Sequence, residues 1–407
     1  MYLDPFTFLD QNRDTVISLQ QELVSRPAIG PENGGQGEQA KADFLAAYLR
    51  QIGLTKVQNL AAPDSRVETG ERPNLAAILP GLDTSRTLWI VSHMDVVPPG
   101  DLQLWTSDPF TLHRDGDIIY GRGVEDNHHG LVASVLAAKA FIHTGRTPKI
   151  NLGLLLVADE ETGNTYGFEY VMSQHKELFQ AQDQFLVPDF GQADASCIEV
   201  AEKGLMWLKI TVHGQQCHAS TPQAGKNSLV AAAQCILELR KLYSFFDVRN
   251  QLFDPPYSTF EATKIEANVP NVNTIPGKGV FYCDCRILPG YSLSDVMSRV
   301  SQIAGRVAEK TGQQIEVELV HQQQTSNTPS DCPLVHSLQR AIADVYHVQA
   351  MPHGIGGGTV ASYARRQGFH AAVWATLPGN AHQPNEQTSI QNIIQDAKVM
   401  TRLACTI

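Results

Sequence analysis

Acidic side chains gather where apolar, strand-like runs of this sequence end. In "LGLLLVADEETGN" (152–164), an apolar run leads directly into Asp159, Glu160 and Glu161. Adjacent carboxylates repel one another and are costly to take out of water. A solvated loop and a metal centre both account for such a cluster, so other parts of the sequence must decide between them.

Further acidic or histidine residues lie near the ends of strand-like runs or just before a helix: His93, Asp95, Asp126, Asp189 and His382. Open α/β sheets bind ligands at the carboxyl ends of their strands. Imidazole and carboxylate ligands suit zinc, with manganese and cobalt as alternatives. His93 and Asp95 are two residues apart and share a strand face, so the carboxylate is placed to orient the imidazole.

Each of these residues also has an ordinary explanation. Asp126 suits a helix cap, and Asp189 suits a turn. The adjacent His128 and His129 are predicted to begin a helix rather than to bind metal. The metal hypothesis therefore depends on the coincidence of several candidates at separate strand ends.

The surrounding sequence predicts an α/β fold. The chain has 407 residues, of which 43% are hydrophobic and 18% charged, and this indicates a globular protein of two domains. Apolar runs at 87–97 and 149–159 alternate with helical patterns at 38–53 and 130–145. Such alternation favours a mixed, largely parallel sheet flanked by helices.

A second domain is predicted within the first. Between about 205 and 322 the order of elements is β-α-β-β-α-β, which is that of a ferredoxin-like α+β unit. One of its helices follows Asn227, a suitable N-cap. Residues 1–204 and 323–407 then form the larger domain around this insert.

Composition excludes several classes of protein. The net charge is −11 and the basic residues are dispersed, which argues against a nucleic-acid partner. No apolar run approaches ~20 residues and the start lacks signal-peptide features, so no membrane partner is expected. Seven cysteines without C-x-x-C spacing favour reduced thiols and a cytoplasmic location.

Six segments follow the order of motifs in one known family: "SHMDVVPPGD", "YGRGVEDNHHG", "ADEETGN", "HASTPQAGKNS", "NTIPG…CDCRILPG" and "NAHQPNE". They resemble those of the dinuclear zinc amidohydrolases and metallopeptidases of the acetylornithine deacetylase, succinyl-diaminopimelate desuccinylase, aminoacylase and carboxypeptidase G group. The match covers essentially the whole chain. It implies that 1–204 and 323–407 form a catalytic metal-binding domain, and that 205–322 form a lid and dimerisation domain.

The resemblance implies a role for each metal candidate. Asp126 bridges two divalent ions, expected to be zinc, with cobalt and manganese as alternatives. His93 and Asp189 complete one site, and Glu161 and His382 complete the other. Two cations offset the repulsion among the carboxylates, which would account for the acidic end of the 149–159 strand.

Two positions are less typical of the family. Members often carry Asp-Lys-Gly or a close variant after the bridging Asp, where this chain has Asn-His-His-Gly at 127–130. The acid at Asp189 lies in a weak motif, so Asp194 and Glu199 stay alternatives to it.

The resemblance also implies catalytic residues. Glu160 is the general base that takes a proton from a metal-bound water, and Asp95 supports His93. Asp159 is only a neighbour of these residues. His218, in "CHASTP", helps to stabilise the tetrahedral oxyanion, in this family often from the partner subunit. A surface histidine that precedes a helix is its alternative explanation.

Substrate contacts are implied at four positions. Arg286 grips a substrate carboxylate with its planar guanidinium, and Asn273 is a companion donor. Gly358 and Thr359 lie in the glycine-rich turn of "GIGGGTVASYARR" (354–366), which suits a carboxylate at a helix start. A purely structural turn is the alternative.

These residues together predict a metal-dependent enzyme that hydrolyses the amide bond of an N-acyl amino acid or related amine, as a deacetylase or desuccinylase does. A dipeptidase or carboxypeptidase acting on short peptides is the alternative. A catalytically silent binding relative is less favoured, because no expected ligand is replaced. The resemblance further implies a homodimer.

Overall fold

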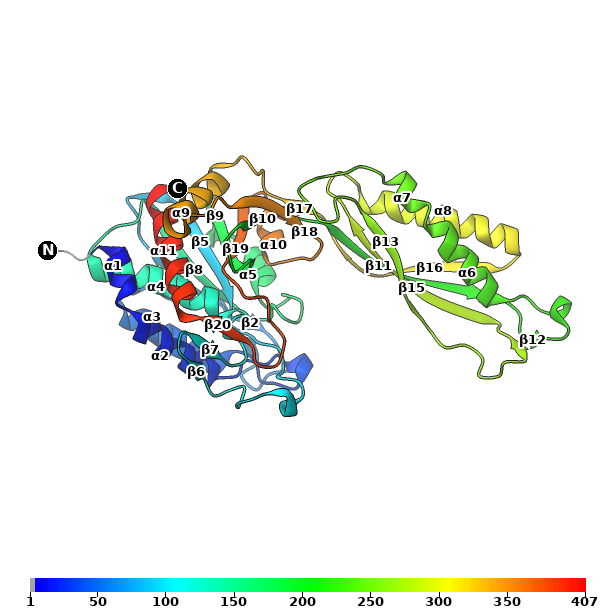
Figure 1. Cartoon of the computed structure of the whole chain (residues 1–407), viewed down its shortest axis with the longest axis horizontal. Helices are drawn as coiled ribbons and strands as arrows, with labels where there is room; N and C mark the ends of the chain where they lie inside the picture. The colour runs from blue at the N-terminus through cyan, green and yellow to red at the C-terminus, as the bar shows by residue number, and fades with distance from the viewer. Residues whose placement is uncertain (1–3) are drawn as a thin grey trace. The chain divides into compact units, whose positions relative to one another are not determined.

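The computed structural model describes residues 4–407 (Figure 1). They form two compact units. The first contains residues up to Val200, Thr328–Pro352 and Thr359–Ile407, and the second contains Ala201–Asn327 and His353–Gly358. The sequence placed the insert at 205–322 and did not predict that the 353–358 segment groups with it. The assignment of catalytic and lid roles to the two parts stays a prediction.

The first unit is built on a mixed sheet with the strand order β1-β4-β8-β5-β9-β19-β10. In that order, the strands span Val57–Asn59, Leu75–Leu79, Ile150–Val157, Asp83–His93, Gln184–Gly191, His370–Ala375 and Cys197–Glu202. The four central strands β8, β5, β9 and β19 run parallel, and the outer strands pair antiparallel. This confirms the predicted α/β class.

Helices cover both faces of this sheet (Figure 1). Helix α4 (His128–Thr144) and helix α11 (Ile390–Thr406) pack on one face. Helices α5 (Phe168–Gln174) and α10 (Ala361–Arg366) pack on the other, against a buried cluster that includes Trp89 and Val91 of β5. Helix α4 ends where Gly145 adopts φ 65°, a left-handed conformation that favours glycine, as the sequence predicts.

The parallel strands deliver the candidate residues to one edge of the sheet. β5 ends at His93, and β8 ends two residues before Asp159. Asp189 lies within the last three residues of β9. β19 ends at Ala375 and leads into the loop that carries His382. Because adjacent parallel strands end at the same edge, the fold itself brings these side chains together.

The second unit is a ferredoxin-like α+β unit, in agreement with the predicted order of elements. Its elements are β11 (Gly204–His213), α6 (Ser228–Leu239), β13 (Thr259–Ile265), β15 (Lys278–Ile287), α8 (Leu293–Thr311) and β16 (Gln314–Gln323). The strands form an antiparallel sheet in the order β13-β15-β11-β16, with α6 and α8 on one face (Figure 1). Asn227 caps α6 by accepting from the backbone N–H groups of Leu229 and Val230, as predicted.

The remaining helices are α1 (Pro5–Asp10), α2 (Arg13–Val24), α3 (Gln39–Gln51), α7 (Leu242–Phe245) and α9 (Pro333–Tyr346). The short strands are β2 (Ala62–Pro63), β3 (Glu71–Arg72), β6 (His113–Asp115), β7 (Ile118–Tyr120), β12 (Cys217–His218), β14 (Thr274–Ile275), β17 (Ser326–Asn327), β18 (Met351–Ile355) and β20 (Gln387–Ser389). Within residues 4–407, no helix combines the length and apolar character that crossing a membrane requires.

Candidate metal centre

Two groups of side chains converge at the carboxyl edge of the sheet in the first unit. The ligand atoms of His93, Asp126 and Asp189 lie within 4.8 Å of one another, and so do those of Asp126, Glu161 and His382. Asp126 belongs to both groups. Its Oδ1 is 2.8 Å from His93 Nε2, and its Oδ2 is 3.0 Å from His382 Nε2. A carboxylate that offers one oxygen to each group has the arrangement of a bridging ligand.

The remaining donors complete each group on its own side. Asp189 Oδ1 lies 3.4 Å from His93 Nε2, and Glu161 Oε2 lies 3.0 Å from His382 Nε2. The two alternatives to Asp189 lie elsewhere. Asp194 bonds to the hydroxyl and backbone of Ser196, and Glu199 is buried in an ion pair with Arg365. The structure therefore assembles the five residues that the sequence proposed as ligands.

The accumulated negative charge also fits a pair of divalent cations. Burial raises the pKa of Glu160 well above its usual range, and the nearby carboxylates of Asp189 and Glu161 raise it further. Burial likewise raises the pKa of Glu161 to about 7. Ionised carboxylates this close together are unfavourable unless cations lie among them, so both the types of donor and their charge fit the proposed metals.

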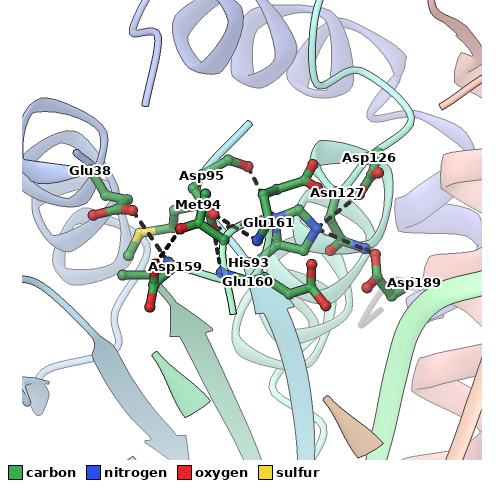
Figure 2. A network of polar contacts seen from close by, with 12 residues as sticks. Glu38, His93, Met94, Asp95, Asp126, Asn127, Asp159, Glu160, Glu161 and Asp189 are labelled. Carbon is green, nitrogen blue, oxygen red and sulfur yellow. Dashed lines mark hydrogen bonds and ion pairs between the residues drawn. The ribbon is translucent and has the colours of Figure 1, made fainter. Parts of the chain in front are cut away.

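Asp95 supports the centre differently from the expected carboxylate–imidazole contact. His93 Nδ1 lies 3.0 Å from the backbone oxygen of Asp95, beyond the end of β5, and 3.5 Å from its carboxylate. Because a carbonyl only accepts, Nδ1 carries the proton and the unprotonated Nε2 faces Asp126 and Asp189, as a metal ligand would. The carboxylate instead accepts from the N–H groups of Glu160 (3.1 Å) and Glu161 (3.0 Å) (Figure 2).

A buried network holds the acidic turn that follows β8. Asp159 adopts φ 60°, and its carboxylate accepts from the Thr162 hydroxyl and the Tyr166 N–H. Its own N–H donates to Glu38 over 3.3 Å, and Glu38 is paired with the fully buried Arg72. Figure 2 shows Glu38 and Asp159 on the side of the network away from Asp189. From the sequence, Asp159 was expected to be only a neighbour of the site residues, and neither Glu38 nor Arg72 was singled out.

Two buried glutamates lock together the loops at 121–126 and 379–386. Glu386 accepts from three backbone N–H groups of the first loop at 3.0, 2.9 and 3.0 Å, and from Arg122 Nη1 at 2.6 Å. Glu125, in the first loop, accepts from two backbone N–H groups of the second at 2.6 and 2.9 Å. This exchange fixes the loops that carry Asp126 and His382. Glu386 lies inside the quoted segment "NAHQPNE", but its role was not predicted.

His128 and His129 begin α4, as predicted, and neither belongs to the two ligand groups. His129 Nε2 lies 2.9 Å from the buried Asp396. His128 Nε2 lies 2.7 Å from the Nζ of Lys41, which is itself fully buried and donates to the backbone oxygen of Met94 at 2.8 Å. Both imidazoles therefore tie the start of α4 to neighbouring elements.

His218 and Asn273 lie near each other at a small two-stranded sheet of the second unit, His218 at the end of β12 and Asn273 just before β14. Strand β12 pairs with β14 there, and the N–H of Ala219 donates to the backbone oxygen of Asn273 at 2.8 Å. His218 Nδ1 accepts from the backbone N–H of Ser220 at 3.1 Å. The proton of the neutral ring must then be on Nε2, which makes the exposed edge of His218 a hydrogen-bond donor.

Arg286 already has partners within the second unit. Its Nε and Nη2 bind the carboxylate of Asp284 at 2.7 and 3.0 Å, and its Nη1 donates to the backbone oxygen of Gly356 at 2.7 Å. Gly358 lies in the same unit, where an added Cβ would meet the side chain of Gln323. Thr359 lies in the first unit, and its hydroxyl accepts from the N–H of Ala361 at the start of α10.

Comparison with known proteins identifies the family. The profile of Peptidase family M20/M25/M40 matches residues 89–406. An uncharacterized metallohydrolase of Methanococcus maripaludis is 38% identical over 405 residues, covering 95% of this chain and 97% of the relative. A succinyl-diaminopimelate desuccinylase of Paracidovorax citrulli is 31% identical over 333 residues, covering 80% of each chain. The chain belongs to peptidase family M20/M25/M40 and is a metallohydrolase of that family.

Solved structures share the fold. The aminopeptidase PepT of Bacillus cereus superposes with a TM-score of 0.77 at 17% identity, covering 96% of this chain and 98% of the other. Human carnosine dipeptidase 1 superposes with a TM-score of 0.71, also at 17% identity, covering 99% and 98%. Metallohydrolases of this family use divalent metals, and the two ligand groups around Asp126 are the candidate positions for them.

Proposed function

We propose that this metallohydrolase cleaves the amide bond of an N-acyl amino acid or a related amine. The observation that carries the proposal is Asp126, whose two oxygens face separate histidine-containing groups, with Glu160 beside them. The desuccinylase that is 31% identical over 80% of each chain supports an acyl-amine substrate. Hydrolysis of short peptides, as a dipeptidase or carboxypeptidase, is the second candidate, because the matching family is one of peptidases.

Two divalent ions are part of this proposal, with zinc preferred and cobalt or manganese as alternatives. His93, Asp126 and Asp189 would hold one ion, and Asp126, Glu161 and His382 the other. When bound, the ions supply positive charge that activates a water molecule and polarises the substrate carbonyl.

The side chains of the chain itself perform the remaining steps. Glu160 takes a proton from the attacking water and returns one to the departing amine nitrogen. Asp95 holds the N–H groups of Glu160 and Glu161 and so fixes the turn that presents both carboxylates. His218, with its donor edge at Nε2, is proposed to stabilise the oxyanion, and Asn273 and Thr359 are proposed to contact the substrate.

We expect the purified protein to bind up to two divalent ions per chain and to lose activity on chelation. The measurement is metal analysis after reconstitution with zinc, cobalt or manganese, together with a hydrolysis screen of N-acyl amino acids and dipeptides. Preferred turnover of N-acyl amino acids supports the first candidate, and preferred turnover of dipeptides supports the second. A protein that binds no stoichiometric metal would contradict both.

A homodimer in a reducing compartment such as the cytoplasm completes the proposal. The described cysteines are all free, and burial raises the pKa of Cys283 to about 12, so this thiol is unreactive.

If His218 acts in the partner's site, mixing inactive His218→Ala and Glu160→Ala chains is expected to restore activity in the heterodimer. The rate of mixed samples, with heterodimers verified by mass, is the measurement. No restoration would place His218 in its own subunit's site or outside catalysis.

A further inference from the structure

The helix-free face of the second unit's sheet carries a hollow of about 540 Å³. Helices α6 and α8 bury the alternate residues that include Cys283 and Cys285 of β15. Side chains alternate between the two faces of a strand, so Asp284 and Arg286 point to the opposite face. There they line the hollow together with Trp207 of β11. Trp207 is the cross-strand partner of Asp284 in the β11–β15 pairing.

Asp284 is held in place from two sides. Its carboxylate accepts a hydrogen bond from Trp207 Nε1 at 2.8 Å. It also accepts two hydrogen bonds from Arg286, from Nε at 2.7 Å and from Nη2 at 3.0 Å. Arg286 is held in turn by Gly356, whose backbone oxygen accepts from Nη1. The pair is not buried away from ligands, because the side chain of Arg286 is 31% exposed and that of Asp284 is 24% exposed.

These contacts leave part of the guanidinium available. A guanidinium has five N–H donors and two edges that match a carboxylate. Asp284 takes the Nε–Nη2 edge and Gly356 takes one Nη1 hydrogen, so one N–H on Nη1 and one on Nη2 are left for a second anion. A substrate carboxylate that binds there contacts a guanidinium whose charge Asp284 already partly neutralises. The same carboxylate also lies near the negative charge of Asp284. Both effects weaken its binding compared with binding to an unpaired arginine.

We propose that Asp284 is a specificity-determining residue that acts as an internal counter-anion. It shares Arg286 with the α-carboxylate of the substrate and so limits how strongly that carboxylate is bound. The inference rests on the proposed function, and on the expectation from the family resemblance that Arg286 binds this carboxylate. Its consequence is that a chain without the Asp284 charge should bind acidic substrates more tightly and should treat their uncharged amides as before.

The test compares wild type with Asp284→Asn, which keeps the size and polarity of the side chain but removes its charge. The full-length, metal-loaded enzyme is assayed with the best N-acyl amino acid from the screen and with its α-carboxamide. We expect KM for the acid to fall about three- to tenfold, with kcat within about twofold and KM for the amide unchanged. An unchanged or raised KM for the acid overturns the inference.

Glu318→Gln is the matched control. It also removes one charge from this sheet, but Glu318 pairs with Lys209 at 3.6 Å and does not contact Arg286. The variant is expected to leave both KM values unchanged. If it lowers KM for the acid as much as Asp284→Asn does, the effect is a general one of surface charge and the inference is overturned.

A binding experiment separates this inference from the proposed reaction. Sodium acetate is titrated into wild type and Asp284→Asn at constant ionic strength, and binding is followed by tryptophan fluorescence, with Trp207→Phe to identify the signal. Tighter acetate binding by Asp284→Asn supports the inference even if no N-acyl amino acid is hydrolysed, a result that would contradict only the reaction. Equal or weaker binding overturns the inference even if the reaction is as proposed.

Discussion

Glu160→Gln is expected to lower kcat by about 10²- to 10⁴-fold while both metal ions stay bound. Glu160 belongs to neither candidate ligand group, but burial and the neighbouring carboxylates of Asp189 and Glu161 raise its pKa, as suits a general base. The amide keeps the size of the side chain but cannot take up a proton. Metal content and single-turnover rates, measured on one preparation, separate the two effects.

Glu161→Gln is the matched comparison, because it alters the adjacent residue of the same turn. Glu161 lies 3.0 Å from His382 Nε2 and belongs to the second ligand group. This variant is expected to lose metal, and its activity should recover in part when the metal concentration is raised. If Glu160→Gln loses metal and Glu161→Gln does not, or if Glu160→Gln turns over normally, the two roles are wrongly assigned.

Glu386→Ala is expected to lower the free energy of unfolding by about 3–5 kcal/mol, the usual loss when one partner of a buried ion pair is removed. The change leaves Arg122 without its carboxylate and removes the acceptor of three backbone N–H groups. Denaturation by urea, followed by tryptophan fluorescence, measures the effect. Trp89 and Trp374 are both buried in the first unit and contribute to that signal.

Two further variants define the cause of this loss. Glu386→Gln keeps one acceptor oxygen but removes the charge, so a smaller loss is expected. Glu309→Ala, at an exposed position of α8, should change stability by no more than about 0.5 kcal/mol. Stability of Glu386→Ala equal to that of the Glu309→Ala control would show that the lock between the two loops does not stabilise the first unit.

The parts of the site that the sequence predicts are those that depend on local pattern. Buried strands read as apolar runs, and their ends place His93, Glu161 and His382 at one edge because parallel neighbours share a direction. Helix ends follow equally local rules, as at Asn227 and Gly145. These features need no knowledge of distant partners.

The supporting contacts are less accessible to sequence because they join segments that are far apart. Arg72 forms an ion pair with Glu38, and Glu386 bonds to Arg122 and its loop. In both cases the partners are far apart in the sequence, and no sequence pattern connects them. Buried charges are visible only as ordinary polar residues until their partners are known. Asp284 is an exception, because an acid two residues from Arg286 on a strand must share its face, and this spacing is itself a signal for the pair.

The position of β19 between β9 and β10 has a consequence for the order in which the protein is completed. β9 and β10 are close in sequence, yet the strand that joins them comes from residues 370–375, after the entire Ala201–Asn327 segment has been synthesised. His382 follows later still. A nascent chain therefore contains all of that segment while its candidate metal centre still lacks His382. Because only the completed first unit offers both ligand groups, ions that bind there stabilise the finished fold over incomplete or unfolded chains, by about 2.7 kcal/mol when the free metal is 100-fold above its dissociation constant.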